Sequence, residues 1–164
     1  MSEHTASRMT SWGVGPKFAV ISIAMGLLAI FVNYYYFASL LLACNPPRFL
    51  FGVGLIILGL VMMLVAASQV HQAFNGGRLI TSGIYSYVRD PVYAAWILFI
   101  VPGLFLATGI SFLIVMPFAM YALIRRLITE EERYLEQKFG KEYLDYKKTV
   151  NSIVPKMHRK KRNK

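Results

Sequence analysis

The chain consists mainly of long apolar runs, separated by short breaks that contain polar residues, proline or glycine. Four runs are expected to form membrane-crossing helices, at about 17–42, 49–70, 91–107 and 110–128. A helix needs about 20 apolar residues to cross the hydrocarbon core of a bilayer. Hydrophobic residues make up 56% of only 164 residues, and a soluble domain of this size cannot bury that much apolar surface. The runs therefore predict an all-α, polytopic membrane protein with about four transmembrane helices.

Proline and glycine residues indicate where the helices break and where they meet. The sequence Asn45-Pro46-Pro47-Arg48 ends the first run, because proline lacks an amide donor and restricts the residue before it. Thr108-Gly109 is so short a connection that the third and fourth helices are expected to be antiparallel neighbours. Gly52, Gly54 and Gly59 in the second run predict close contact with another helix.

The charges predict an orientation in the membrane. If the N-terminus lies inside, the outer loops contain Arg48 as their one basic residue, whereas the inner segments contain the rest. The positive-inside rule then places both termini and both polar segments in the cytoplasm. The basic tail, residues 156–164, is expected to attract anionic lipid, and a nucleic-acid partner is not expected.

Arg89-Asp90-Pro91 precedes the third run and has two interpretations. One is a plain helix start, with Asp90 as N-cap, Pro91 in the first turn and Arg89 facing lipid phosphates. The other is a binding site, because Tyr85 and Tyr93 bring aromatic and hydroxyl groups to the same short stretch.

Glu130, Glu131 and Glu132 follow the fourth run and also have two interpretations. They form either a solvated helix face that pairs with nearby basic residues, or a cation site. Consecutive helix residues point about 100° apart, so at most two of these carboxylates can face one pocket. A metal site is not expected, because no histidine or cysteine lies near them.

The C-terminal region is expected to form a cytoplasmic amphipathic helix. Its apolar residues recur at spacings of three and four, which is typical of one helix face. Such a helix would lie in the membrane interface, either as a plain anchor or as the cover of a pocket, with a possible break at Gly140. The stripe consists of Leu135, Phe139, Tyr143, Tyr146 and Val150.

The two polar segments together resemble a family motif. Gly83-Ile84-Tyr85 leads into Arg89-Asp90-Pro91-Val92-Tyr93, and an apolar hairpin then leads to Glu131-Glu132, followed by Leu135, Phe139-Gly140, Tyr143 and Tyr146. On these residues the chain resembles the membrane methyltransferases that include isoprenylcysteine carboxyl methyltransferases and phospholipid N-methyltransferases. The resemblance implies a single membrane domain over 1–164, with the first two helices in 1–75, a catalytic half in 76–155 and the basic tail in 156–164.

The resemblance also implies S-adenosyl-L-methionine as methyl donor and a lipophilic or prenylated acceptor that enters from the lipid. Arg89, Glu131 and Glu132 would be the catalytic residues. The residues that match the donor-binding pattern are Tyr85, Val88, Arg89, Asp90, Pro91, Tyr93, Glu131 and Glu132.

Asp90 departs from the family pattern, which has histidine at this position. A histidine can donate a hydrogen bond to the donor's carboxylate, whereas an aspartate would repel it. Asp90 would instead take the donor's amino group or cap the helix.

Several functions therefore remain open. An isoprenylcysteine-carboxyl-methyltransferase-like enzyme is the first hypothesis, and a phospholipid N-methyltransferase or a thiol S-methyltransferase is an alternative. A small non-enzymatic membrane protein is an alternative of another class, in which Glu131 and Glu132 only pair with basic residues.

Overall fold

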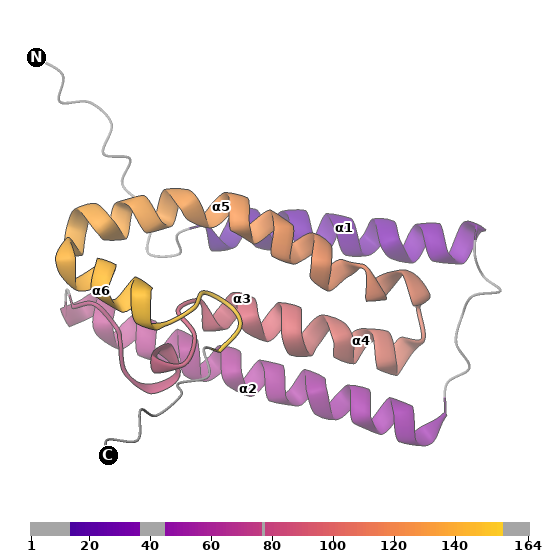
Figure 1. Cartoon of the computed structure of the whole chain (residues 1–164). Helices are drawn as coiled ribbons and strands as arrows, with labels where there is room; N and C mark the ends of the chain where they lie inside the picture. Colours follow the sequence, from indigo (N-terminus) through magenta and orange to yellow (C-terminus); the bar gives the residue numbers. More distant parts are fainter. Residues whose placement is uncertain (1–13, 37–44, 77, 156–164) are drawn as a thin grey trace, which may run out of the picture.

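All regular secondary structure is helical in the part of the chain that the structure, a computed structural model, describes (Figure 1). That part comprises residues 14–36, 45–76 and 78–155, so the basic tail and the end of the first apolar run lie outside it. The all-α prediction is confirmed. The elements are α1 (Gly15–Tyr36), α2 (Pro46–Gly76), η2 (Gly83–Ser86), α3 (Pro91–Ala95), η3 (Trp96–Ile100), α4 (Val101–Thr108), η4 (Ser111–Ile114), α5 (Met116–Phe139) and α6 (Lys141–Thr149).

Three of the described segments are long and apolar enough to cross a membrane. They are Gly15–Tyr36, Pro46–Val70 and Pro91–Thr108, the last formed by α3, η3 and α4 together. The fourth predicted run is divided between η4 and the first half of α5, and α5 continues without a break into the glutamate run. A membrane protein is thus supported, whereas the count of four crossings and the cytoplasmic orientation stay predictions.

The third crossing segment contains a widened, π-helical turn over Trp96–Ile100. The backbone N–H of Val101 donates to the carbonyl of Trp96, five residues earlier. Pro102 follows directly and has no N–H to donate, and its ring crowds the carbonyl four residues before it. The wider turn therefore accommodates a proline in a helix that continues to Thr108.

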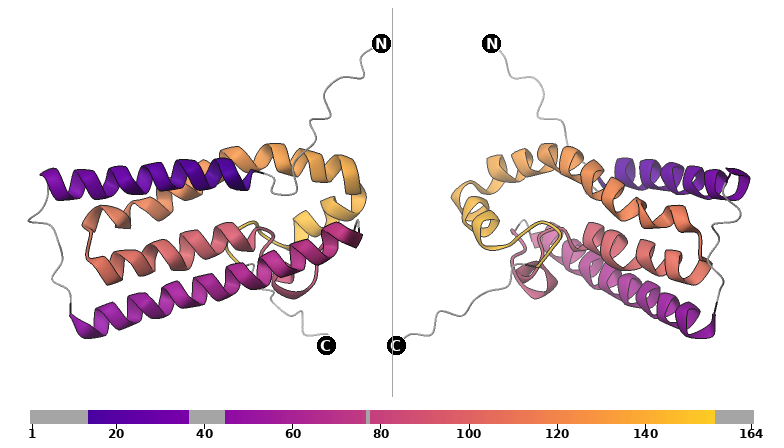
Figure 2. Two further views of the ribbon diagram at one scale, coloured as in Figure 1. Left: turned by 180° about the vertical axis from the view of Figure 1, so that it is seen from behind. Right: turned by 45° about the vertical axis from the view of Figure 1, so that its right-hand side comes forward.

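The helices form a bundle in which α3 and α4 lie in the middle. Figures 1 and 2 show α2 on one side of this segment and α1 with α5 on the other. Contacts between α2 and α4 and between α5 and η3 hold the three layers together, while α1 packs on η4 and α5. As predicted, the turn at Gly109 makes α4 and the following helix antiparallel (Figure 1).

Glycine lets α2 and α4 approach closely. A Cβ atom added to Gly52 would lie 2.7 Å from the carbonyl oxygen of Gly103, and one added to Gly103 would lie 2.7 Å from that of Gly52. A Cβ atom added to Gly59 would likewise lie 2.7 Å from Cγ1 of Ile100. The prediction of close contact is correct for Gly52 and Gly59 but wrong for Gly54, beside which no atom lies within 4 Å.

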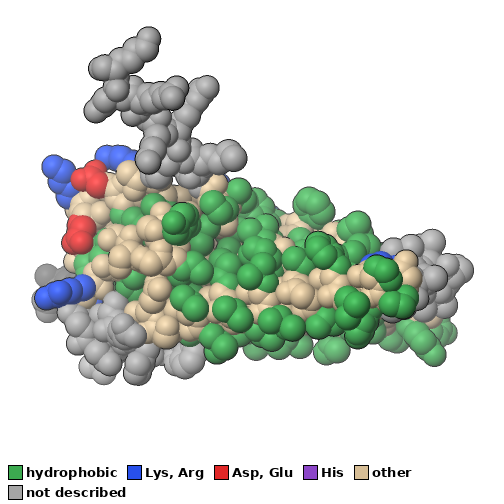
Figure 3. Space-filling view, turned by 90° about the horizontal axis from the view of Figure 1, so that it is seen from below, with side chains coloured by type: hydrophobic (Ala, Val, Ile, Leu, Met, Phe, Trp, Pro, Cys, Tyr) green, Lys and Arg blue, Asp and Glu red, His purple; other side chains and the backbone are tan. Residues whose placement is uncertain are grey.

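The last two helices fold back on the bundle at one end. α5 ends at Gly140, whose φ of 53° is in a region that favours glycine, and α6 starts with the next residue. The bend brings Tyr143 and Tyr146 of α6 into a small cluster with Phe139 and Leu79. Figure 3 shows charged side chains gathered at this end, whereas apolar side chains cover the flank of the bundle.

Candidate functional site

The first polar segment forms the start of α3. Pro91 occupies the first turn, as predicted, and the Asp90 carbonyl accepts the hydrogen bond of Ala94 at 3.0 Å. Asp90 is at the N-cap position, but its side chain makes no capping hydrogen bond. The interpretation of Asp90 as a side-chain cap is therefore wrong.

The Asp90 carboxylate instead binds the C-terminal segment of the chain. The Ser152 hydroxyl donates to Asp90 Oδ2 at 2.6 Å. The backbone N–H groups of Arg89 and Asp90 also donate, at 2.9 Å each, to the carbonyls of Asn151 and Ser152. Three hydrogen bonds thus fix residues that are about 60 positions apart in the sequence.

The three consecutive glutamates face different surroundings. The Glu130 side chain is 74% exposed and lies 4.0 Å from Lys17. Glu132 is mostly buried, and Glu131 has one buried carboxylate oxygen. The expectation that at most two of them can face one pocket agrees with this arrangement.

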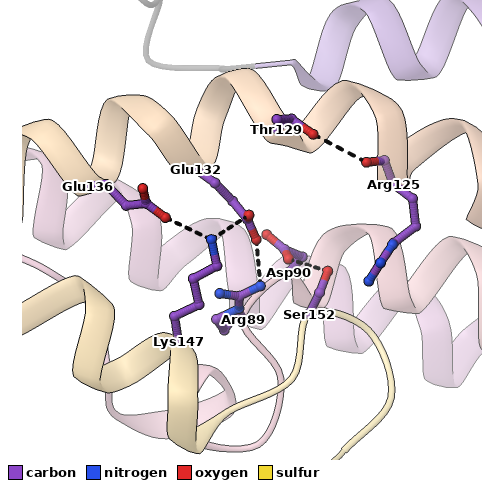
Figure 4. Close-up of polar contacts among 8 residues, drawn as sticks. All are labelled: Arg89, Asp90, Arg125, Thr129, Glu132, Glu136, Lys147 and Ser152. Carbon is purple, nitrogen blue, oxygen red and sulfur yellow. Dashed lines mark hydrogen bonds and ion pairs between the residues drawn. The ribbon is translucent and has the colours of Figure 1, made fainter.

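Glu132 is the centre of a charged network that joins three elements (Figure 4). Arg89 Nη2 lies 2.6 Å from Glu132 Oε1, and the two side chains are only 10% and 19% exposed. Lys147 of α6 lies 2.8 Å from the other oxygen of Glu132 and 2.7 Å from Glu136. The Arg89 guanidinium also lies 6.0 Å from the centre of the Tyr143 ring. The interpretation as a solvated helix face paired these glutamates with nearby basic residues. Glu132 instead pairs with Arg89, just before α3, and with Lys147 of α6.

Some buried polar atoms beside this network have no partner. Within the described residues, Arg89 Nε and Nη1 and Glu131 Oε2 make no hydrogen bond. An unpaired buried polar group costs about 1–3 kcal/mol, so such groups are rare and each calls for an explanation, such as a bound water or a ligand. Here Arg89 contributes cationic donors and Glu131 an acidic acceptor.

Two carboxyl groups at this end have raised pKa values. Burial raises the pKa of Asp90 to about 6, and the Ser152 hydrogen bond and the Arg89 charge oppose that rise. Burial, with the negative charge of Asp90, raises the pKa of Glu131 to about 7, while a backbone hydrogen bond at Val14 opposes it. A cationic group beside either carboxyl would lower its pKa again and so favour its ionised form.

The other residues that match the donor-binding pattern lie in the walls around the network. The Tyr85 hydroxyl points to the Ala66 carbonyl of α2 at 3.5 Å, and the Tyr85 carbonyl accepts from the Tyr146 hydroxyl. Val88 and Tyr93 belong to the main apolar core, and Pro91 is fully buried. Their side chains shape the site, and direct donor contact stays a prediction.

An apolar groove of about 580 Å³ lies between the α3–α4 segment and α5. This volume is within the range of small-molecule sites, about 300–1,000 Å³. Ile153, on its wall, directly follows Ser152, which donates a hydrogen bond to Asp90 beside Arg89. The groove is therefore adjacent to the polar network. Its other lining residues are Ile97, Leu98, Pro102, Phe105, Leu113, Ile114, Pro117, Phe118, Tyr121 and Val154.

Sequence reasoning missed three residues of this region. Lys147 and Ser152 lie beyond the motif glutamates, and only the fold-back at Gly140 brings them to α3. Arg125 was not singled out, yet it precedes Glu132 by seven positions, which places both on one face of α5. Figure 4 shows the Arg125 side chain pointing from α5 toward the α3 side. The helical period was the signal that could have identified it.

The described residues contain no group of three or more His, Cys, Asp or Glu side chains placed to hold a metal ion. The charged groups of the network are instead paired with each other.

Comparison with known proteins gives a consistent result. The model of the isoprenylcysteine carboxyl methyltransferase (ICMT) family matches residues 49–137. The chain is 29% identical over 154 residues to the protein-S-isoprenylcysteine O-methyltransferase of Dictyostelium discoideum, a match that covers 87% of this chain and 62% of that protein. It is 34% identical over 100 residues to that of Rattus norvegicus, covering 58% of this chain and 35% of the relative. It is 28% identical over 113 residues to that of Schizosaccharomyces pombe, covering 63% and 48%.

The matches to these three relatives cover 35% to 62% of the relatives' own length. The family model, by contrast, matches more than half of this chain and includes Arg89, Asp90, Glu131 and Glu132. The chain therefore belongs to the isoprenylcysteine carboxyl methyltransferase family.

Proposed function

We propose that this chain is an S-adenosylmethionine-dependent methyltransferase that methylates a lipophilic acceptor at the membrane, with the carboxylate of a prenylated cysteine as the first candidate. The observation that carries the proposal is the set of unpaired buried atoms of Arg89 and Glu131 inside the family-matched region. The names of the relatives, which are protein-S-isoprenylcysteine O-methyltransferases, support the choice of acceptor.

The donor has one carboxylate, one ammonium group and one sulfonium centre, and the residues present fit these charges. The free N–H groups of Arg89 would donate to the carboxylate, because guanidinium and carboxylate geometries match. The free oxygen of Glu131 would accept from the ammonium group. Asp90 is a second acceptor candidate, although Ser152 already occupies one of its oxygens. Glu132 would hold Arg89 in place through the 2.6 Å contact.

When bound, S-adenosylmethionine supplies a methyl group that its positive sulfur already activates. The chain then has to align the two reactants and exclude water, and a strong general base is optional. A carboxylate acceptor is already nucleophilic and needs no base. The buried network of Arg89, Glu132 and Lys147 supports this role, because paired charges keep the residues in fixed positions.

The apolar groove is the candidate site for the acceptor's lipid chain. It is lined by apolar side chains and is adjacent to the polar network, so a chain lying in it could present its polar end to the donor. Arg125 lies one helical turn from Tyr121, which lines the groove. Its guanidinium is a candidate partner for an anionic acceptor group.

The test is transfer of a labelled methyl group by the purified chain in lipid nanodiscs. Prenylcysteine, phosphatidylethanolamine and a lipophilic thiol would be offered in parallel as acceptors. The proposal predicts a labelled ester of prenylcysteine that is released by mild base. A labelled phospholipid would instead indicate a phospholipid N-methyltransferase, and a labelled thioether would indicate a thiol S-methyltransferase. No labelled product from any acceptor would favour a non-enzymatic membrane protein.

A further inference from the structure

The segment that follows α6 contacts both the polar network and the apolar groove. Ser152 donates its hydroxyl hydrogen bond to Asp90 at 2.6 Å. The next two residues, Ile153 and Val154, line the groove. One short segment therefore joins the start of α3 to the groove.

The two groove-lining residues of this segment differ in how they are held. Ile153 is 2% exposed and belongs to the core cluster with Ala94 and Ile97 of the third crossing segment. Val154 is 56% exposed and faces the groove from its surface side. Ile153 thus anchors the segment, and Val154 presents a side chain whose size can change without loss of core packing.

The groove has three walls of unequal rigidity. Two are long helical segments, α3–α4 and α5, whose spacing is fixed by core residues such as Met120 and Ile124. The third is the non-helical segment at 151–154, which the start of α3 holds by hydrogen bonds. The third wall is therefore the one that a small change in sequence can shift.

We propose that residues 152–154 are the acceptor-selecting wall of the groove, held in place by the Ser152–Asp90 hydrogen bond. The occupant is a single hydrocarbon chain of a lipid acceptor, because the groove is apolar and its wall residue Ile153 directly follows Ser152, which binds Asp90. This inference rests on the proposed function and adds which residues set the length of chain that fits.

The first experiment changes the size of the wall. Val154→Trp narrows the groove, and Val115→Trp is the matched control, because Val115 is also 56% exposed but does not line the groove. The full chain in nanodiscs would be given S-prenylated N-acetylcysteine with two, three or four isoprene units. We expect Val154→Trp to raise KM for the four-unit acceptor roughly tenfold relative to the two-unit acceptor, whereas Val115→Trp leaves the ratio unchanged. Val154→Ala should shift the preference toward the longer chain.

The second experiment loosens the wall. Ser152→Ala removes the hydroxyl that binds Asp90, and Ser152→Thr retains it. We expect Ser152→Ala to raise the acceptor KM by roughly three- to tenfold, with a smaller change in the donor Kd through Asp90 and with kcat within about twofold. Ser152→Thr should restore the acceptor KM. A merely structural role would lower kcat and donor binding together and would overturn the proposal.

Equilibrium binding of fluorescent versions of the same acceptors separates this inference from the proposed function. If the wild type binds them without methylating them, the enzymatic function fails, and the wall is still tested by the Kd of each variant. The inference is overturned if Val154→Trp and Val115→Trp give the same chain-length profile, or if the wild type binds none of the acceptors.

Discussion

The polar end of the molecule and its apolar flank are held together by different kinds of contact. At the polar end, named atoms of Arg89 before α3, Glu132 of α5 and Lys147 of α6 pair at 2.6 to 2.8 Å. On the flank, α2 and α4 pack closely because Gly52 and Gly103 have no side chains. The flank therefore depends on size, whereas the polar end depends on the identity and charge of single groups, which is what ligand recognition needs.

Glu131 and Glu132 repeat this contrast within the polar end. Glu132 has two cations beside it. Glu131 has an unpaired buried oxygen and a pKa that burial raises to about 7. One carboxylate stabilises the fold, and we propose that the other binds the donor.

The largest expected effect comes from Arg89→Ala. It leaves Glu132 largely buried with Lys147 as its remaining cation, and breaking a buried pair costs about 3–5 kcal/mol of unfolding free energy. Donor affinity should fall at least about a hundredfold, since two free N–H donors are lost. Thermal unfolding and donor titration in nanodiscs measure both effects. Arg126→Ala, on the exposed side of α5, is the control. If the Arg89→Ala variant were as stable as this control, the polar end would not depend on the charge of single groups.

The glutamate run offers a matched series for the next effect. Glu131→Gln should weaken donor binding roughly tenfold or more but raise the melting temperature of the unliganded protein, because it removes a charge that burial disfavours. Glu132→Gln should lower the melting temperature, because Arg89 and Lys147 lose their partner. Glu130→Gln, 74% exposed, should change neither. If Glu131→Gln and Glu132→Gln changed the melting temperature and the donor affinity in the same way, the two carboxylates would not have different roles.

The flank should respond to size alone. Gly52→Ala places a methyl group 2.7 Å from backbone atoms of α4 and should destabilise the protein by about 1–3 kcal/mol. Gly54→Ala meets no atom within 4 Å and should be neutral or slightly stabilising. Thermal unfolding compares the two variants, and both should retain wild-type donor affinity per folded molecule. Loss of donor affinity in folded Gly52→Ala protein would show that the flank and the polar end are not independent.

A smaller effect is expected from pH. Asp90 and Glu131 have raised pKa values, about 6 and about 7, so the folded chain holds more protons than the unfolded chain below pH 7. The stability of the unliganded protein should therefore fall as pH rises from about 4 to 7. Donor affinity should rise over about pH 6 to 8 by up to roughly tenfold and then level off, because the ionised carboxylate is the better partner for an ammonium group. Calorimetry in two buffers of different ionisation enthalpy would detect the released proton, and Glu131→Gln should release less.

The sequence predicted the parts of this molecule that depend on local pattern. Apolar runs and the position of Pro91 gave the helices and the start of α3. The 100° helical step allowed at most two of the three glutamates in one pocket, and the motif match had left out Glu130, which is exposed. The family motif brought Arg89 and Glu132 into one hypothesis, although their ion pair was not expected.

The rest depends on tertiary contacts that no local pattern encodes. Lys147 and Ser152 reach the site through the bend at Gly140 and the path of the chain after α6. No regular spacing in the sequence therefore relates them to Arg89. The same holds for Asp90, whose position predicted a helix cap but whose carboxylate takes a hydroxyl hydrogen bond from the C-terminal segment instead. Gly54 was predicted to touch another helix because glycine permits close approach, yet it lies on another face of α2.

The central claim is that the unpaired atoms of Arg89 and Glu131 are a binding site for the methyl donor. The most direct measurement is isothermal titration of the nanodisc-embedded chain with S-adenosylmethionine. We predict saturable binding at one site per chain that is abolished in Arg89→Ala, weakened in Glu131→Gln and unchanged in Glu130→Gln. Absence of binding to the wild type, or equal affinity in all four proteins, would contradict the account.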